Sequence, residues 1–313
     1  MIKPVLKGEA LLRNIHAAAA KPEERLSLWW LGQSGFLIQW GGTHLACDPF
    51  LSDVPRDRVE GSASSLVRVA EPALEPHQLD FVDVVTASDL QFDHLDSDTL
   101  GTLFGINPKL ELFIPEAVRE DVLRLLACDP DRITGLDDDL SETLDDITIL
   151  GVAATKEEDR NADGRCERLG YIIQLGPWTV YHSGDVVPFE GLEERLRAFA
   201  IDVALLPVAG PVEGSGPAET LTPTDAARLA KAIDARLAIP CHFEMFDTDG
   251  SPAEEFARAC ERLEQPFRIL RCGEPWSDRE LEAAEGEEDE TGSVGRVGGW
   301  GRSRPGGVED DEV

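Results

Sequence analysis

The stretch Phe81 to Asp96, which reads FVDVVTASDLQFDHLD, decides the fold prediction for this chain. Its first half, Phe81 to Ala87, is apolar and β-branched, which is typical of a buried strand. Asp89, Asp93 and His94 follow directly after that strand. Side chains on a loop that follows a buried strand are held by a rigid scaffold and stay accessible, so binding and catalytic groups gather there. The stretch therefore predicts a functional site at the end of this strand.

The same pattern recurs twice downstream. The apolar run Trp178 to His182 leads into Asp185, and the run Leu237 to Ile239 leads into His242. A lone histidine after a strand is more often a hydrogen-bonded structural residue, so only the joint pattern favours a metal. Two imidazoles and two carboxylates at one sheet edge form a donor set that zinc or manganese accepts. The predicted metal ligands are Asp93, His94, Asp185 and His242.

Short strands and helices alternate around these loops. The expected strands include Leu26 to Leu31, Gly35 to Trp40, Thr43 to Cys47, Ile147 to Ala153, Leu169 to Leu175 and Val203 to Pro207. The expected helices are Pro115 to Ala127, Leu192 to Phe199, Thr222 to Ile233 and Pro252 to Leu263. Strands followed by helices in each half of the chain predict an α/β protein with two packed sheets and helices outside.

Composition narrows the function classes. The chain has 313 residues and a formal net charge of −32, which disfavours a nucleic-acid partner. No apolar run approaches the roughly 20 residues that a membrane span needs. The six cysteines include no Cys-x-x-Cys pair, and the N-terminus lacks the layout of an export signal. We therefore expect a cytoplasmic protein that binds neither nucleic acid nor membrane; its oligomeric state has no signal in the sequence.

The chain divides into two parts by composition. Residues 1–278 carry all the periodic segments and are expected to form one domain. Residues 279–313 are acidic and Gly-rich, which predicts a disordered tail. One hypothesis for function follows from this tail alone, since an acidic segment can recruit a basic protein partner.

Other catalytic motifs are absent from the sequence. Neither a Gly-x-x-x-x-Gly-Lys loop nor a Gly-x-Gly-x-x-Gly turn occurs, which disfavours nucleotide-dependent enzymes. Ser34 lies in Gly32-Gln33-Ser34-Gly35, which does not match the Gly-x-Ser-x-Gly elbow of serine hydrolases. We interpret Ser34 as a turn residue.

Five ordered segments resemble the metallo-β-lactamase fold superfamily of metal-dependent hydrolases. They are Trp30 to Ile38, Asp48 to Ser52, Asp93 to Asp96, Tyr181 to Asp185 and Ile239 to Phe243. The chain looks most like the branch that contains L-ascorbate-6-phosphate lactonase. The resemblance implies an αββα sandwich of two mixed sheets with helices outside and a metal site along one edge.

The chain departs from the family pattern at its first metal site. The family motif His-x-His-x-Asp-His falls on Asp89, Gln91, Asp93 and His94, and the next family histidine falls on Lys156. The first site is therefore degenerate at Asp89, Gln91 and Lys156. The residues that resemble the second site, namely Asp93, His94 and His242, remain, together with the bridging Asp185.

The departures suggest a specific hypothesis. The Lys156 ammonium would occupy the place of the missing first cation, paired with Asp89 and also with Asp185, and would stabilise a developing oxyanion. The alternative is that Asp89, Gln91 and Lys156 are polar loop residues that face water. Asp48 is interpreted as a turn residue or a support for the ligands, and His182 as a residue that orients its loop.

Two functions of different classes are consistent with this pattern. The first is a hydrolase with one divalent metal, zinc or manganese, acting on a small-molecule ester, lactone or phosphorylated sugar, with Asp93 and Lys156 as catalytic residues. The alternative is a catalytically inactive pseudoenzyme or binding scaffold without a metal, because a fold does not guarantee its usual activity.

Overall fold

The computed structural model describes residues 1–20, 25–53, 67–156, 160–210, 220–246 and 252–281. The chain divides into one unit at Met1–Asp278 and a second at Arg279–Val313. Residues 282–313, and with them most of the predicted acidic tail, lie outside the described residues. The fold and the candidate site described below belong to the first unit.

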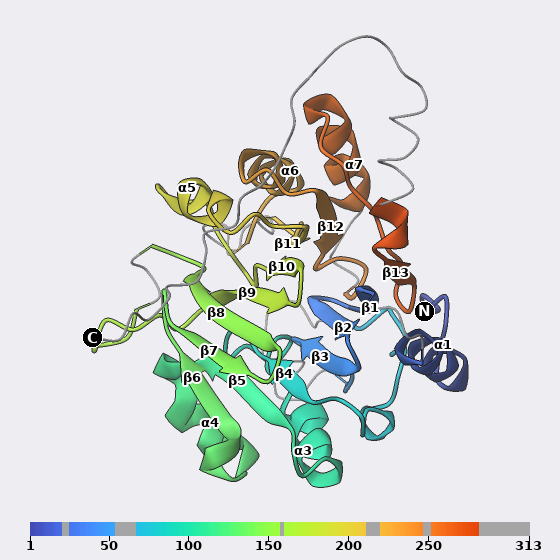
Figure 1. The fold of residues 1–313 in the computed structure, drawn as a ribbon, viewed down its shortest axis with the longest axis vertical. Helices are drawn as coiled ribbons and strands as arrows, with labels where there is room; N and C mark the ends of the chain where they lie inside the picture. The colour runs from blue at the N-terminus through green and yellow to red at the C-terminus, as the bar shows by residue number, and fades with distance from the viewer. Residues whose placement is uncertain (21–24, 54–66, 157–159, 211–219, 247–251, 282–313) are drawn as a thin grey trace, which may run out of the picture. The chain divides into compact units, whose positions relative to one another are not determined.

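The first sheet contains seven strands among the described residues, in the order β13-β1-β2-β3-β4-β5-β6 (Figure 1). β1, β2 and β3 pair antiparallel, β3 to β6 pair parallel, and β13 returns from the end of the unit to pair antiparallel with β1. The bounds are β1 Ser27–Gly32, β2 Gly35–Trp40, β3 Thr43–Cys47, β4 Val84–Thr86, β5 Glu111–Pro115, β6 Ile133–Leu136 and β13 Pro275–Ser277.

The second sheet contains six strands within the same described ranges, in the order β12-β11-β10-β9-β8-β7. β10, β11 and β12 pair parallel, while β7, β8, β9 and β10 pair antiparallel. The bounds are β7 Ser141–Leu144, β8 Ile147–Ala153, β9 Leu169–Leu175, β10 Trp178–His182, β11 Val203–Pro207 and β12 Leu237–Cys241.

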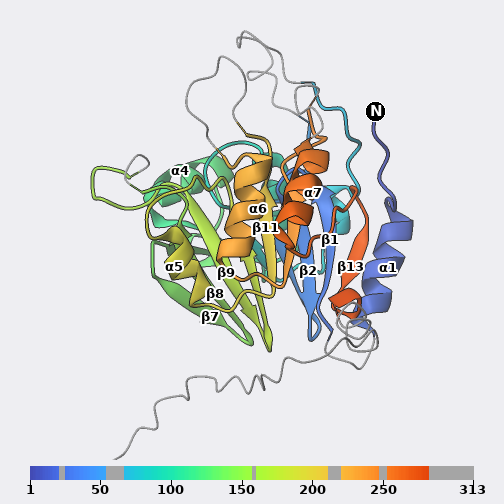
Figure 2. The ribbon, with the colours of Figure 1, turned by 90° about the horizontal axis from the view of Figure 1, so that it is seen from above.

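Helices cover the outer faces of both sheets. An apolar cluster that includes Leu11, Leu103 and Val122 packs α1, α3 and α4 against the first sheet. Figure 2 shows α5, α6 and α7 along the second sheet, and α6 contacts β11 and β12. The bounds are α1 Glu9–Ala19, α3 Ser97–Ile106, α4 Arg119–Leu126, α5 Leu192–Arg197, α6 Pro223–Ala232 and α7 Pro252–Leu263, with short 3-10 turns η1 Pro76–Gln78, η2 Glu116–Val118 and η3 Pro130–Arg132. The predicted layering of two sheets with helices outside is confirmed.

Local chemistry explains why these elements begin where they do. β1 and β2 are buried along their whole length, as continuous apolar runs between two covered faces require. The Thr222 side chain accepts a hydrogen bond from the backbone N–H of Asp225, and Pro223 opens α6. Asp96 caps α3 in the same way, by accepting from Asp98 and Thr99.

Two elements differ most from the sequence-based expectation, while several others differ by one or two residues at an end. The strand expected over Phe81 to Ala87 is limited to β4, because only its central residues pair with both β3 and β5. The helix expected over Pro115 to Ala127 begins at Arg119, after β5 and η2. Pro115 instead ends a buried strand that pairs with β6, and Glu116–Val118 form η2.

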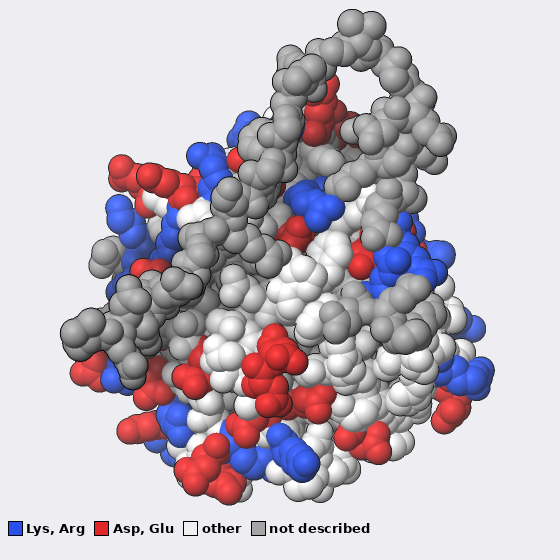
Figure 3. All heavy atoms as spheres, viewed as in Figure 1, with Lys and Arg blue, Asp and Glu red and all other residues white. Residues whose placement is uncertain are grey.

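Charged side chains of both signs are mixed on one face of the molecule (Figure 3), and the cysteines form no disulfide. On the face drawn in Figure 3, the described Lys and Arg side chains lie among Asp and Glu side chains, with uncharged side chains between them. All six cysteines are unpaired, and all but Cys128 are buried. None of the helices formed by the described residues has the length and apolar character needed to cross a bilayer.

Candidate metal centre

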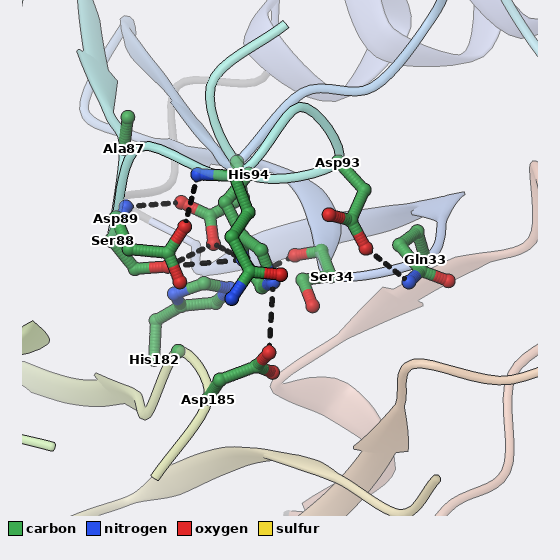
Figure 4. Close-up of polar contacts among 12 residues, drawn as sticks. Gln33, Ser34, Ala87, Ser88, Asp89, Asp93, His94, His182 and Asp185 are labelled. Carbon is green, nitrogen blue, oxygen red and sulfur yellow. Dashed lines mark hydrogen bonds and ion pairs between the residues drawn. The ribbon is translucent and has the colours of Figure 1, made fainter. Parts of the chain in front are cut away.

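Loops from both sheets bring the polar side chains together. Asp48 directly follows β3, and Ser88 to His94 lie in the loop after β4 of the first sheet. Asp185 follows β10 and His242 directly follows β12 of the second sheet. Figure 4 shows Asp93 and Asp185 extending toward the region around His94 from different elements. The structure therefore places all the predicted metal ligands in one cluster that spans the two sheets.

The distances within this cluster suit a metal ion. His94 Nε2 lies 3.2 Å from Asp185 Oδ2. His242 Nε2 lies 3.7 Å from Asp93 Oδ2 and 3.7 Å from Asp185 Oδ1. A tetrahedral shell with ligands at about 2.0–2.1 Å from zinc puts neighbouring ligand atoms about 3.3 Å apart. The donor atoms are therefore already spaced for a single ion, although their binding of one stays a prediction.

His94 is oriented as a metal ligand should be. Its Nδ1 lies 2.6 Å from Asp48 Oδ2, and both side chains are fully buried. A carboxylate that accepts the Nδ1 proton leaves Nε2 as the nitrogen that can coordinate. Ser88 holds the carboxylate in turn, since its backbone N–H and its hydroxyl both donate to Asp48. Asp48 thus combines a turn at φ 39° with support of a ligand, the two roles expected for it.

The two candidate donor triads share one residue. Two overlapping triads have donor atoms within 4.8 Å of one another, namely Asp93, His94 and His242, and Asp89, His94 and Asp185. Both triads depend on His94, and its ring has only Nε2 left for coordination. Because one lone pair serves one ion, the two triads cannot each hold an ion with His94 as a ligand, which agrees with the single ion that we expect.

The electrostatics of the cluster also fit a missing positive charge. Burial raises the pKa of Asp89 to about 7, and the neighbouring carboxylates of Asp185 and Asp93 add to the rise. Burial alone would lower the pKa of His94, but the surrounding carboxylates outweigh it and raise that pKa well above its usual value. Burial alone would raise the pKa of Asp185, yet His94 and His242 hold it below its usual value. Carboxylates this crowded are what a divalent cation would neutralise.

The residues of the degenerate first site do not stay together. Asp89 is 2% exposed, with Oδ1 accepting from the Gln91 backbone N–H and Oδ2 buried without a hydrogen-bond partner. The Gln91 side chain is exposed. Lys156 is half-exposed, and its Nζ lies 3.8 Å from Glu190 Oε2. The predicted pairing of Lys156 with Asp89 and Asp185 is therefore wrong, because the ammonium faces a surface carboxylate on the Asp185 loop.

The hypothesis that all three positions face water is also only partly right. It holds for Gln91 and Lys156, which are exposed. It fails for Asp89, whose carboxyl is buried beside His94 and Asp185. The loop after β4 turns Asp89 inward, so this position keeps a donor where the family places a histidine.

Two further residues of the centre were assigned other roles or none. Gln33 is fully buried, and its Nε2 lies 2.9 Å from Asp93 Oδ2 and 3.0 Å from His242 Nε2. The sequence signal was its place in the Gly32-Gln33-Ser34-Gly35 turn between two buried strands. His182 has Nε2 2.9 Å from the backbone oxygen of Ser34 in that turn, which agrees with its expected role in orienting a loop.

Comparison with known proteins places this architecture in a family. The model for the beta-lactamase superfamily domain matches residues 27–242, which include all the predicted ligands. The chain is 25% identical over 261 residues to a UPF0173 metal-dependent hydrolase of Aeropyrum pernix, covering 80% of this chain and 96% of that relative. It is also 25% identical over 239 residues to a UPF0173 metal-dependent hydrolase of Myxococcus xanthus, covering 74% of this chain and 75% of the relative.

Solved structures agree on the fold. Igni18, described as a metallo hydrolase from Ignicoccus hospitalis, superimposes with a TM-score of 0.59 at 20% identity, covering 81% of this chain and 98% of the other. An isothiocyanate hydrolase from Delia radicum gut bacteria superimposes with a TM-score of 0.64 at 17% identity, covering 80% and 98%. With the αββα layering and the domain match over most of the first unit, the chain belongs to the beta-lactamase superfamily, with the metallo-β-lactamase fold.

Proposed function

We propose that the protein is a metal-dependent hydrolase that uses one divalent cation, zinc or manganese, held by Asp93, His94, Asp185 and His242. The observation that carries this proposal is that these side chains converge from loops of both sheets, with three contacts between their donor atoms at 3.2 to 3.7 Å. The relatives named as metal-dependent hydrolases support the same class of reaction. The buried carboxylates support a cation over an empty scaffold, because without one their charges are poorly compensated.

The chain's own groups have distinct tasks in this proposal. A bound cation would polarise a carbonyl or phosphoryl oxygen and lower the pKa of a bound water. Asp48 fixes the ring of His94 through Nδ1. Asp89 presents a buried carboxyl oxygen without a hydrogen-bond partner beside His94 and Asp185, where it would face a bound cation. Lys156 is left out of the catalytic groups, since its ammonium is half-exposed beside Glu190.

We propose three candidate substrate classes. Hydrolysis of a small-molecule ester, lactone or phosphorylated sugar suits a site that polarises an acyl or phosphoryl oxygen. The resemblance to the lactonase branch supports these classes as the first to be screened. Chromogenic esters, γ- and δ-lactones and sugar phosphates cover them, each assayed with zinc-loaded and manganese-loaded protein.

Metal content per chain tests the proposal before any substrate is known. The protein is purified without chelators, loaded with excess zinc or manganese, desalted and analysed by elemental analysis. We expect one equivalent per chain in the wild type. Asp185→Asn and His242→Gln should each lose most of that equivalent, because each removes one donor of the shell. His77→Gln is the matched control, since His77 is exposed in η1.

Each other outcome has a defined meaning. Two equivalents would show that the first site still binds metal, against the single-ion assignment. One equivalent that persists in both ligand variants would place the ion elsewhere. The absence of metal from loaded wild type would overturn the hydrolase proposal in this form.

A further inference from the structure

We propose that, without a bound metal, the carboxamide of Gln33 donates to the Nε2 lone pair of His242, so that metal binding requires this contact to break. Gln33 is thus a positioning residue that sets the metal affinity of the centre. The inference rests on the proposed function, because it concerns the same donor atoms.

The geometry of the carboxamide carries the inference. Asp93 Oδ2 and His242 Nε2 lie 3.7 Å apart, and the single Nε2 of Gln33 lies 2.9 Å from the first and 3.0 Å from the second. An atom at hydrogen-bond distance from both engages the His242 nitrogen that a shared cation would need. Figure 4 shows the dashed contact from the Gln33 side chain to Asp93. Because Gln33 is fully buried, water does not compete for these two contacts.

The orientation of the carboxamide determines which proton each partner carries. Turning the amide over would set its oxygen against the Asp93 carboxylate, so the nitrogen must face Asp93. That same nitrogen has only hydrogens to offer His242 Nε2, which therefore accepts. The neutral imidazole then carries its proton on Nδ1, which has no hydrogen-bond partner among the described residues, and its one Nε2 lone pair is used by Gln33.

Metal coordination and this hydrogen bond exclude each other. A carboxylate has spare lone pairs, so Asp93 can bind a cation and still accept from an amide. His242 Nε2 has a single lone pair, which either accepts from Gln33 or coordinates a metal. Binding therefore breaks the Gln33 to His242 contact, and its loss is part of the cost of loading the centre.

The backbone of Gln33 stays in place while its side chain moves. Its carbonyl oxygen accepts hydrogen bonds from Trp30 Nε1 at 2.9 Å and from the backbone N–H of His242 at 3.0 Å. These contacts fix the turn to the His242 loop. The carboxamide oxygen is buried without a hydrogen-bond partner among the described residues, so movement of the side chain gives up no contact of that atom. The movable part is limited to the side chain.

Gln33→Met tests the inference, since methionine keeps the length of the side chain and lacks the two N–H groups of the carboxamide. Zinc affinity of the full chain is measured by competition with a chromogenic chelator. We expect the variant to bind zinc about three to ten times more tightly, the effect of one hydrogen bond that no longer has to break. The melting temperature of the metal-free variant should fall, while that of the zinc-loaded variant should match loaded wild type. Gln39→Met, at a second buried glutamine in β2 away from the ligands, is the control for packing.

The outcomes separate this inference from the proposed function. Equal or weaker zinc binding by a folded Gln33→Met variant would overturn the inference and leave the hydrolase proposal standing. Failure of wild type to bind zinc would overturn both.

A second measurement tests the inference if the Gln33→Met variant does not fold. In wild type labelled with ¹⁵N, His242 should carry its proton on Nδ1 without metal, with its signals assigned by comparison with His242→Gln. The side-chain amide signals of Gln33 should shift with one equivalent of zinc. Amide signals unchanged by bound zinc, or a His242 protonated on Nε2 in the metal-free protein, would overturn the inference.

Discussion

Asp48 Oδ2 lies 2.6 Å from His94 Nδ1, with both side chains completely buried between the two sheets. The carboxylate can only accept, so the ring must present its Nδ1 proton to it. This contact decides which nitrogen of His94 is directed toward Asp185. The metal affinity of the centre therefore depends on a residue that does not itself belong to the donor set.

Asp48→Asn should weaken metal binding about 10- to 100-fold, as loss of a supporting carboxylate typically does. The new NH₂ group can donate to Nδ1, which moves the ring proton to Nε2 and blocks coordination. The dissociation constant for zinc, measured with a competing chelator, checks this. Asp98→Asn, which changes an exposed carboxylate in the first turn of α3, should leave the dissociation constant for zinc unchanged. An unaltered constant in Asp48→Asn would mean that His94 does not coordinate through Nε2.

Asp89→Asn should stabilise the metal-free protein at neutral and alkaline pH. The pKa of Asp89 is raised to about 7 in the fold from an ordinary 3.8, so ionisation costs folding free energy. Wild-type stability therefore falls as the pH rises from about 4 to about 7, and the variant lacks this loss. The free energy of unfolding of the variant should equal that of wild type at pH 4. It should exceed it by up to about 4 kcal/mol at pH 8, at about 1.4 kcal/mol per pKa unit.

Urea unfolding with chelator present, at intervals from pH 4 to pH 8, measures this difference. Asp163→Asn, at an exposed carboxylate, is the control and should follow wild type at every pH. A constant difference across the range would contradict the burial of an ionising Asp89.

Gly184→Ala should both destabilise the fold and weaken metal binding. Gly184 has φ +54°, and a Cβ there would lie 2.7 Å from Ser88 Cβ and 2.9 Å from the backbone oxygen of Leu169. The added methyl would push the Asp185 loop away from the loop that carries His94. We expect a loss of about 2–4 kcal/mol from overpacking and the left-handed backbone, measured by urea unfolding. Gly101→Ala in α3 has nothing within 4 Å and should raise stability slightly.

Asp96→Ala should destabilise the first unit by about 2–4 kcal/mol. Its carboxylate caps α3 and also accepts from the backbone N–H groups of Leu51 and Ser52, so one side chain joins a helix to the loop after β3. Thermal and urea unfolding measure the loss. Asp129→Ala removes an exposed cap of η3 and should cost under about 1 kcal/mol. Similar losses of unfolding free energy in the two variants would show that the contacts of Asp96 with Leu51 and Ser52 do not contribute to stability.

The fold and most of the cluster followed from residues adjacent in sequence. Strand ends can be read from apolar runs, and the ends of strands in one sheet meet at one edge, so Asp185 and His242 could be placed near each other. Their place beside His94, which follows a strand of the other sheet, came from the family resemblance. α3 gave a weaker signal, because Gly101 and Gly105 lower the helix propensity of a short segment.

The features that the sequence did not predict depend on contacts between residues far apart in the chain. Gln33 acquires its role from His242, which is 209 positions away. The direction in which Lys156 points depends on how the chain turns after β8, where the segment leading to Gly170 offers no second motif. A pattern of residue types cannot specify which surface carboxylate a flexible lysine meets, and here it meets Glu190.

β13 has a consequence for the order of assembly during synthesis. β13 pairs with β1. Leu28 is synthesised early and its partner Trp276 near the end of the unit, so this strand pair cannot form until most of the unit has been made. Until then the backbone of β1 presents unpaired N–H and C=O groups on that edge, which invites association with other chains. A ribosome-bound chain arrested before Pro275 should therefore need chaperone protection that the finished unit does not.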